Sequence, residues 1–116
     1  MRHLKKKKTL DRKKGPRRAL MRNLATSLIL HEKIKTTEAK AKALRSIAER
    51  LVTISKKSDL TARKRLLAYL TQERAAKKMI EVIGPKYLLR SGGYLRINKV
   101  GPRLSDGAKI VEIEFV

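Results

Sequence analysis

Apolar residues recur at intervals of three and four along much of the chain, and this spacing is typical of helices with one buried face. The pattern begins after Gly15-Pro16, where proline is tolerated because the first helical turn leaves its N–H groups unpaired. It predicts four helices: from Arg17 to about His31, from Thr37-Glu38 to about Lys56, from Ser58-Asp59 through Leu70, and from about Gln72 to Ile83. Thr37 is placed to cap the second helix, and Gly84-Pro85 is expected to end the fourth.

Other segments alternate apolar and polar residues, which is the pattern of a half-buried strand. The residues from Tyr94 to Val100 and from Lys109 to Val116 alternate in this way, and a turn-rich segment over 101–107 joins them. The short β-branched segment Ile34–Thr37 predicts a brief edge strand.

The predicted order is helix, strand, three helices and two strands, which suits an α+β two-layer domain with a small mixed sheet packed on helices. We expect this single globular domain over residues 15–116. The most continuous apolar face of any predicted strand is that of Val111, Ile113 and Phe115. This strand should therefore be central and lie under three residues of the long second helix, Leu44, Ile47 and Leu51.

Charge sets the first 14 residues apart from this domain. The chain has 31 Lys and Arg against 10 Asp and Glu, a formal net charge of +21, and self-repulsion of that size favours a polyanionic partner. Residues 1–14 are strongly basic and lack apolar periodicity. They predict a basic extension that orders on RNA.

Several classes of protein are excluded by composition. The chain has no Cys and only His3 and His31, so we expect no disulfide framework, no metal site and no cofactor. The basic start is not followed by the apolar segment of a secretory signal, and no apolar run is long enough to span a bilayer. These features favour a cytoplasmic protein without membrane contact.

Little in the sequence favours catalysis. Asp106, Glu112 and Glu114 lie in or near predicted loops and strands, but no nucleophile or histidine accompanies them, so solvated or ion-paired carboxylates are expected. Gly92-Gly93 precedes a strand and does not open a helix, so the geometry of a nucleotide-binding loop is missing. The glycines predict either a turn that lets Arg90 and Tyr94 approach a partner or a plain structural turn.

The basic residues favour contact with nucleic acid, since guanidinium groups match phosphate geometry and ammonium groups supply mobile charge. Arg18 and Arg22 are four residues apart on one helix face, where a phosphate ridge could lie. The N-terminal set is Arg2, Lys5, Lys6, Lys7, Lys8, Arg12, Lys13, Lys14, Arg17, Arg18 and Arg22. A weaker C-terminal set is Lys86, Arg90, Arg96, Lys99, Arg103 and Lys109. Arg96 and Lys99 have opposite strand parity and cannot serve one flat face.

The scarcity of aromatic residues narrows the kind of nucleic acid. Only three Tyr and one Phe are present, too few for the stacking platforms that bind single strands. Recognition of folded RNA through its backbone and shape is the remaining interpretation. A DNA-compacting architectural protein is an alternative, although no wedge or dimerisation surface is evident. An RNA-modifying enzyme is a third, without a cofactor loop to support it.

A set of ordered motifs adds to this interpretation. They are the opening MRH, then RNLATSL, IKTTEAKAKALR, ERLVTISK, IGPKY, RSGGYLRINKVGPR and the closing EIEFV. Together they resemble the family of bacterial large-subunit ribosomal protein seventeen along nearly the whole chain. The chain differs from the usual pattern at Lys13-Lys14-Gly15-Pro16 and at Ser105.

The resemblance implies one strand, a helical layer and a C-terminal hairpin. It also implies a non-enzymatic protein that binds large-subunit ribosomal RNA near the exit of the peptide tunnel and contacts neighbouring ribosomal proteins. Outside the ribosome we expect a monomer. The positions expected by analogy to touch or frame RNA are Arg2, His3, Arg12, Arg17, Arg22, Lys35, Thr36, Lys40, Arg90, Tyr94 and Arg96.

Overall fold

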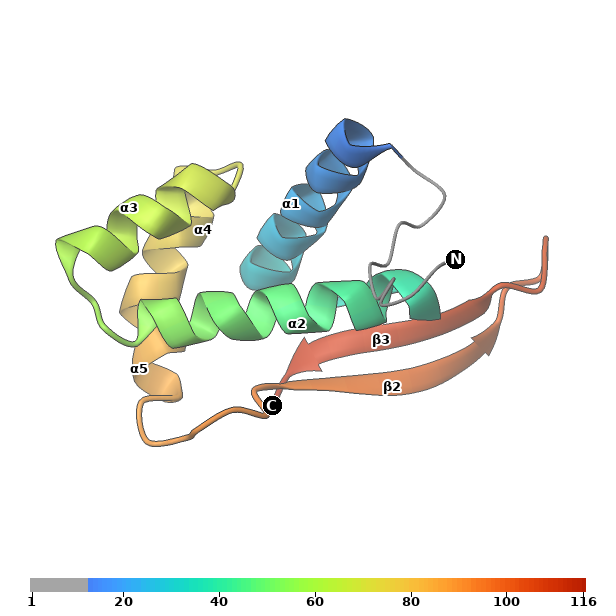
Figure 1. The fold of residues 1–116 in the computed structure, drawn as a ribbon. Helices are drawn as coiled ribbons and strands as arrows, with labels where there is room; N and C mark the ends of the chain where they lie inside the picture. Colours follow the sequence, from blue (N-terminus) through green and yellow to red (C-terminus); the bar gives the residue numbers. More distant parts are fainter. Residues whose placement is uncertain (1–12) are drawn as a thin grey trace, which may run out of the picture.

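The computed structural model describes residues 13–116, which form one layer of helices over one face of a three-stranded sheet (Figure 1). The expected α+β class is confirmed. The elements are α1 (Lys14–His31), β1 (Lys33–Thr37), α2 (Glu38–Ser55), α3 (Leu60–Tyr69), α4 (Glu73–Lys78), a π-helical turn η1 (Met79–Ile83), α5 (Gly84–Lys86), β2 (Leu95–Pro102) and β3 (Lys109–Phe115). Within this range, no helix combines the length and apolar character needed to cross a bilayer.

The sheet has the strand order β1-β3-β2, with β3 in the centre as predicted and β1 at one edge. Both pairings are antiparallel, so the expectation of a mixed sheet was wrong. The connections explain this arrangement. β2 and β3 form a hairpin, and β1 enters on the free side of β3 running in the same direction as β2.

The core lies between β3 and the long helix α2. Val111 and Ile113 of β3 are fully buried, and Leu44 and Leu51 of α2 are buried in the same cluster. Ile47 packs against this core but is only partly buried. The predicted contact between this strand and the second helix is therefore confirmed.

The C-terminal end of β3 is less deeply buried than the alternating pattern suggested. Phe115 packs against the edge of the core and keeps part of its surface exposed. Its ring centroid lies 6.3 Å from that of Tyr87, which in turn lies 5.2 Å from the ring of Tyr94. Tyr87 also donates a hydrogen bond from its hydroxyl to the carbonyl of Val116, so a small aromatic cluster holds the last residue in place.

The second and third helices begin close to the predicted positions. Thr37 is the N-cap residue of α2, although its side chain makes no capping hydrogen bond. Asp59 caps α3, where its carboxylate accepts a hydrogen bond from the backbone N–H of Ala62 at 2.7 Å. On α3, Leu66 is buried, whereas Leu67 lies on the outer face and is 40% exposed.

The fourth predicted helix does not end at Gly84-Pro85. It continues through η1 into α5 as far as Lys86. We attribute this to the wide π-helical turn that precedes Pro85, since proline has no N–H to donate and its ring normally interrupts a regular α-helix. α1 likewise begins earlier than predicted, at Lys14, with Pro16 inside its first turn.

Gly84 is required where this continuous helix meets the end of α2. A Cβ atom built on Gly84 would lie 2.7 Å from the backbone oxygen of Ser55 and 3.0 Å from that of Met79. Backbone atoms cannot move aside as the end of a flexible side chain can. The two helix segments can therefore approach this closely only with glycine at position 84.

We predict that Gly84→Ala lowers the free energy of unfolding by about 2 kcal/mol, the usual effect of adding a methyl group to a tightly packed site. Helix propensity alone would favour alanine by about 1 kcal/mol, so the two effects have opposite signs. Urea unfolding measures the result. Gly15→Ala is the control, because Gly15 is helical and a Cβ atom there would meet nothing within 4 Å. A stabilised Gly84→Ala variant would contradict the packing described here.

Candidate nucleic-acid interface

The N-terminal candidates lie at the free end of α1 as far as the structure describes them. Lys13 is the N-cap residue of α1, and Lys14, Arg17 and Arg18 occupy its first turns. Lys13, Lys14 and Arg18 are exposed, and Arg17 is partly exposed. The other N-terminal candidates fall outside the described residues: Arg2, His3, Lys5, Lys6, Lys7, Lys8 and Arg12. The prediction that residues 1–14 form an extension ordered on RNA also rests mainly on residues outside that range.

Arg22 has a structural role that the sequence did not indicate. Its guanidinium donates from Nε to the carbonyl of Tyr69 at 2.6 Å and from Nη2 to the carbonyl of Ala68 at 3.1 Å. It also lies 5.9 Å from the centroid of the Tyr69 ring. These carbonyls are at the C-terminal end of α3, where no further helical turn supplies donors. Arg22 therefore ties α1 to α3, and Arg18 remains exposed on the neighbouring surface.

The face of the sheet opposite the helices is polar and carries two of the candidates. Lys35 of β1 and Arg96 of β2 are exposed on this face, on either side of central strand β3. Thr36 points to the opposite, helix-covered face and is partly buried. Lys40 is partly exposed in the first turn of α2. The structure thus brings Lys35 and Arg96 to one surface and leaves Thr36 and Lys40 on another.

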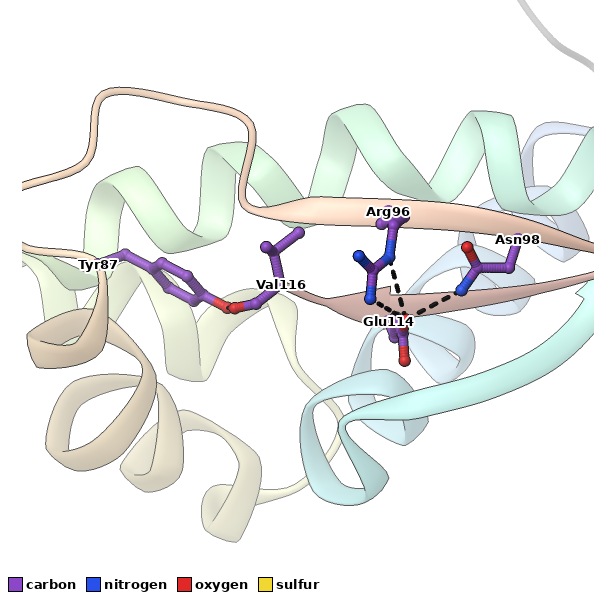
Figure 2. Close-up of polar contacts among 5 residues, drawn as sticks. All are labelled: Tyr87, Arg96, Asn98, Glu114 and Val116. Carbon is purple, nitrogen blue, oxygen red and sulfur yellow. Dashed lines mark hydrogen bonds and ion pairs between the residues drawn. The ribbon is translucent and has the colours of Figure 1, made fainter.

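Glu114 holds Arg96 in place on this open face (Figure 2). The guanidinium of Arg96 donates to Oε1 of Glu114 from Nη2 at 2.7 Å and from Nε at 3.2 Å, and Asn98 Nδ2 donates to the same oxygen at 2.9 Å. These hydrogen bonds, that from Arg96 first, lower the pKa of Glu114 below its ordinary value. Glu112 and Glu114 have the same parity in β3 and lie on the same face of the sheet. Glu114 therefore orients the Arg96 guanidinium and offsets part of its charge.

The turn containing Gly92 and Gly93 is built around Tyr94. Both glycines have positive φ angles, 88° and 65°, which L side chains rarely adopt. Tyr94 is buried, and its hydroxyl donates to the carbonyl of Arg90 at 3.1 Å. The ammonium of Lys56 donates to both this hydroxyl and that carbonyl, and it lies 4.6 Å from the centroid of the Tyr94 ring.

These contacts give Tyr94 a supporting role. Hydrogen bonding from Lys56 is the main reason that the pKa of Tyr94 is lowered. The Tyr94 ring is enclosed and does not face outward. For Tyr94, this arrangement fits the second of the two predicted alternatives, a plain structural turn. Arg90, by contrast, is exposed at its surface.

The remaining candidates lie along the β2–β3 hairpin. Lys99 is exposed and pairs in register with Val111, whereas Arg96 pairs with Glu114, which confirms their opposite parity. A bulge at Val100 shifts the register beyond Lys99. In the hairpin loop, Arg103 donates to both carboxylate oxygens of Asp106, at 2.9 and 2.7 Å. This pair orders the loop and presents Arg103 at its surface.

We predict that the hairpin loop keeps its structure until the solution is strongly acidic. The hydrogen bond from Arg103, followed by that from the backbone of Ala108, lowers the pKa of Asp106 from 3.8 to about 2. A depressed folded-state pKa stabilises the loop above the unfolded value, and this contribution is lost as the pH falls through the folded value. The carboxyl carbon of Asp106, followed by NMR, should titrate near pH 2. An Arg103→Gln variant should return it toward the ordinary value, and an unchanged titration would refute the pairing.

The structure also shows exposed basic residues that the sequence reasoning missed. They lie on α2, α3, α4 and the connection between α2 and α3: Arg50, Lys57, Arg63, Lys64, Arg65 and Lys77. The cluster Arg63-Lys64-Arg65 was a visible signal, because three consecutive cations beside a single buried Leu66 must mostly face solvent. Both basic sets named from the sequence lie toward the ends of the chain, and this cluster lies between them.

The candidates among residues 13–116 do not gather into one patch. The start of α1, the open face of the sheet and the tip of the β2–β3 hairpin lie on separate parts of a molecule that measures 43 × 33 × 25 Å (Figure 1). Within residues 13–116, no three His, Asp or Glu side chains come together as metal ligands would. A basic surface distributed in this way can contact several segments of a folded polyanion at once.

Comparison with known proteins places this arrangement in a family. The family described as ribosomal protein L17 matches residues 20–116. The chain is 50% identical over 107 residues to the large ribosomal subunit protein bL17 of Clostridium botulinum, covering 92% of this chain and 95% of the relative. It is 49% identical, with the same coverage, to the protein of that name from Clostridium perfringens. Because these matches extend over most of its length, the chain belongs to the ribosomal protein L17 family.

Proposed function

We propose that this protein is a structural constituent of the large ribosomal subunit in the cytoplasm. In this role it binds and packs folded ribosomal RNA through contacts to the RNA backbone and shape, near the exit of the peptide tunnel, beside neighbouring ribosomal proteins. The observation that carries the proposal is the family match over residues 20–116. The relatives' name, large ribosomal subunit protein, supports a role in assembly and not in catalysis.

The surface chemistry supports contact with phosphates. Exposed cations lie at the start of α1, on the open sheet face and at the turn that contains Arg90. A charge of +21 on 116 residues repels itself until a polyanion neutralises it. Each phosphate that is neutralised also releases condensed counterions, so binding should be strong at low salt and weaken steeply as salt rises.

The burial of the aromatic residues favours backbone and shape over base stacking. Tyr87 and Tyr94 are buried, and Tyr69 and Phe115 pack partly into the core. These four are all the aromatic residues of the chain. With two rings buried and two partly buried, little aromatic surface is left on which unpaired bases could stack as they do on single-strand binders.

A competition assay tests the proposal against the DNA-compacting alternative. The full-length protein is bound to labelled large-subunit ribosomal RNA folded in magnesium, and unlabelled duplex DNA or unlabelled ribosomal RNA is then added. We expect ribosomal RNA to compete at much lower nucleotide concentration than duplex DNA. Equal competition would reduce the interaction to general charge attraction and would overturn the proposal.

A further inference from the structure

A basic pocket lies between the C-terminal half of α2 and the start of α3. It has a volume of about 450 Å³ and is lined by Arg50, Thr53, Ile54, Lys57, Asp59, Thr61, Ala62 and Arg65. Ala62 is buried and Ile54 is partly buried, so these residues form the floor. The three cations are exposed and come from different turns of the two helices and from the connection between them. They converge on the pocket because α2 and α3 pack together there.

These cations are available to a ligand. No hydrogen bond or ion pair joins the side chains of Arg50, Lys57 or Arg65 to any residue in the described part of the chain. This distinguishes them from Arg22, Arg96 and Arg103, whose guanidinium groups already bond within the fold. Guanidinium groups bind oxyanions through paired N–H donors, and an ammonium group adds charge without a fixed direction.

Among residues 13–116, Asp59 is the only carboxylate that lines the pocket, and it does not neutralise the three cations. One of its oxygens accepts a hydrogen bond from the Ala62 N–H and caps α3. Because the first turn of α3 already has this acceptor, the helix end adds little attraction for an anion. Three cations against one carboxylate leave a net charge of +2 around the pocket. Thr53 and Thr61 add hydroxyl groups at the rim.

We propose that this α2–α3 pocket binds one phosphodiester group of the RNA, held by Arg50 and Arg65 with Lys57 as additional charge. The volume of about 450 Å³ leaves room for a tetrahedral oxyanion between the two helices. The site lies on helices outside both basic sets recognised in the sequence. It rests on the proposed function and adds to it a defined contact point on the helical layer.

The test compares two double variants of the full-length protein. Arg50→Gln with Arg65→Gln removes both guanidinium groups of the pocket. Arg45→Gln with Arg74→Gln removes the same number of the same residue type from α2 and α4, outside the pocket, where each arginine already bonds a neighbouring side chain. Binding to folded large-subunit ribosomal RNA is measured over a range of salt concentrations, and circular dichroism verifies that each variant folds.

We expect the pocket variant to flatten the slope of log K against log salt by about one unit, the effect of one lost phosphate contact. The control variant should stay close to the wild-type slope. In parallel, inorganic phosphate titrated into ¹⁵N-labelled protein should shift the Nε–H signals of Arg50 and Arg65 but not that of Arg63. Equal slopes for both variants, or equal shifts at all three arginines, would overturn the pocket proposal. Failure of the wild-type protein to bind ribosomal RNA would instead refute the proposed function.

Discussion

Removal of residues 2–12 should weaken binding to ribosomal RNA by on the order of a thousandfold near physiological salt. This segment holds six basic residues, Arg2, the run Lys5–Lys8 and Arg12, against Asp11 alone. Each phosphate that such a residue neutralises adds roughly 0.7–0.9 to the slope of log K against log salt. Lys13, the N-cap residue of α1, is kept so that the first helix begins unchanged. Filter binding at several salt concentrations measures both quantities.

Two substitutions of the same segment separate charge from residue identity. Replacing Lys5–Lys8 with four arginines keeps the charge and should leave the slope almost unchanged. Replacing them with four glutamines should flatten the slope by about three units, since roughly 0.7–0.9 is lost at each position. A truncated protein with the wild-type slope would place the electrostatic contact on the folded domain alone.

Ile113→Ala should lower the free energy of unfolding by about 4 kcal/mol, because a buried isoleucine loses both its burial and its packing partners. Ile113 is fully buried in the central strand and pairs in register with Ile34 on one side and Ile97 on the other. A domain of this size has only about 5–15 kcal/mol in total, so most of its stability would be lost. Urea unfolding of the RNA-free protein measures the difference.

Two residues of the same strand provide the comparison. Ile110 lies on the opposite face and is partly exposed, so Ile110→Ala should cost clearly less. Phe115→Ala should also cost less than the 3–5 kcal/mol of a fully buried phenylalanine, because Phe115 keeps part of its surface exposed. Equal losses for Ile113 and Ile110 would contradict the burial of one face of β3. RNA should partly rescue the Ile113 variant, because a ligand that binds only the folded state stabilises it by mass action.

The sequence predicted the sheet well because β3 is its most regular segment. Val111, Ile113 and Phe115 alternate with Glu112 and Glu114, so only one face of the strand can pack on the core. A strand with such an apolar face is expected in the centre of the sheet, with a neighbouring strand on each side. The pattern could not show that β1 runs antiparallel to β3. That direction depends on how α1 and α2 cross the sheet, which no local signal encodes.

The helix boundary at Gly84 shows where local rules fail. Gly-Pro ordinarily ends a helix, yet here glycine serves the close approach to the carbonyl of Ser55, and a π-helical turn precedes Pro85. The close approach depends on a contact between segments far apart in the chain. Propensity reports the preference of a residue on its own, and tertiary packing overrides it at this position.

The sequence identified exposed cations more reliably than it identified the role of each residue in the fold. Exposure of Lys35 and Arg96 follows from their polar positions in the alternating strands, whereas Lys99 is exposed although it shares the parity of Leu95 and Ile97. The internal hydrogen bonds of Arg22 and the enclosure of Tyr94 depend on partners 47 and 38 residues away, Tyr69 and Lys56. The basic pocket between α2 and α3 was likewise invisible, since its cations meet only when the two helices pack.

Sedimentation of the endogenous protein tests the central claim most directly. A lysate is separated on a sucrose gradient in high magnesium, with and without prior treatment by ribonuclease or by deoxyribonuclease, and each fraction is probed for the protein. We expect it in the large-subunit and intact-ribosome fractions, released by ribonuclease and unaffected by deoxyribonuclease. Recovery at the top of the untreated gradient, or release by deoxyribonuclease alone, would contradict a structural role in the large ribosomal subunit.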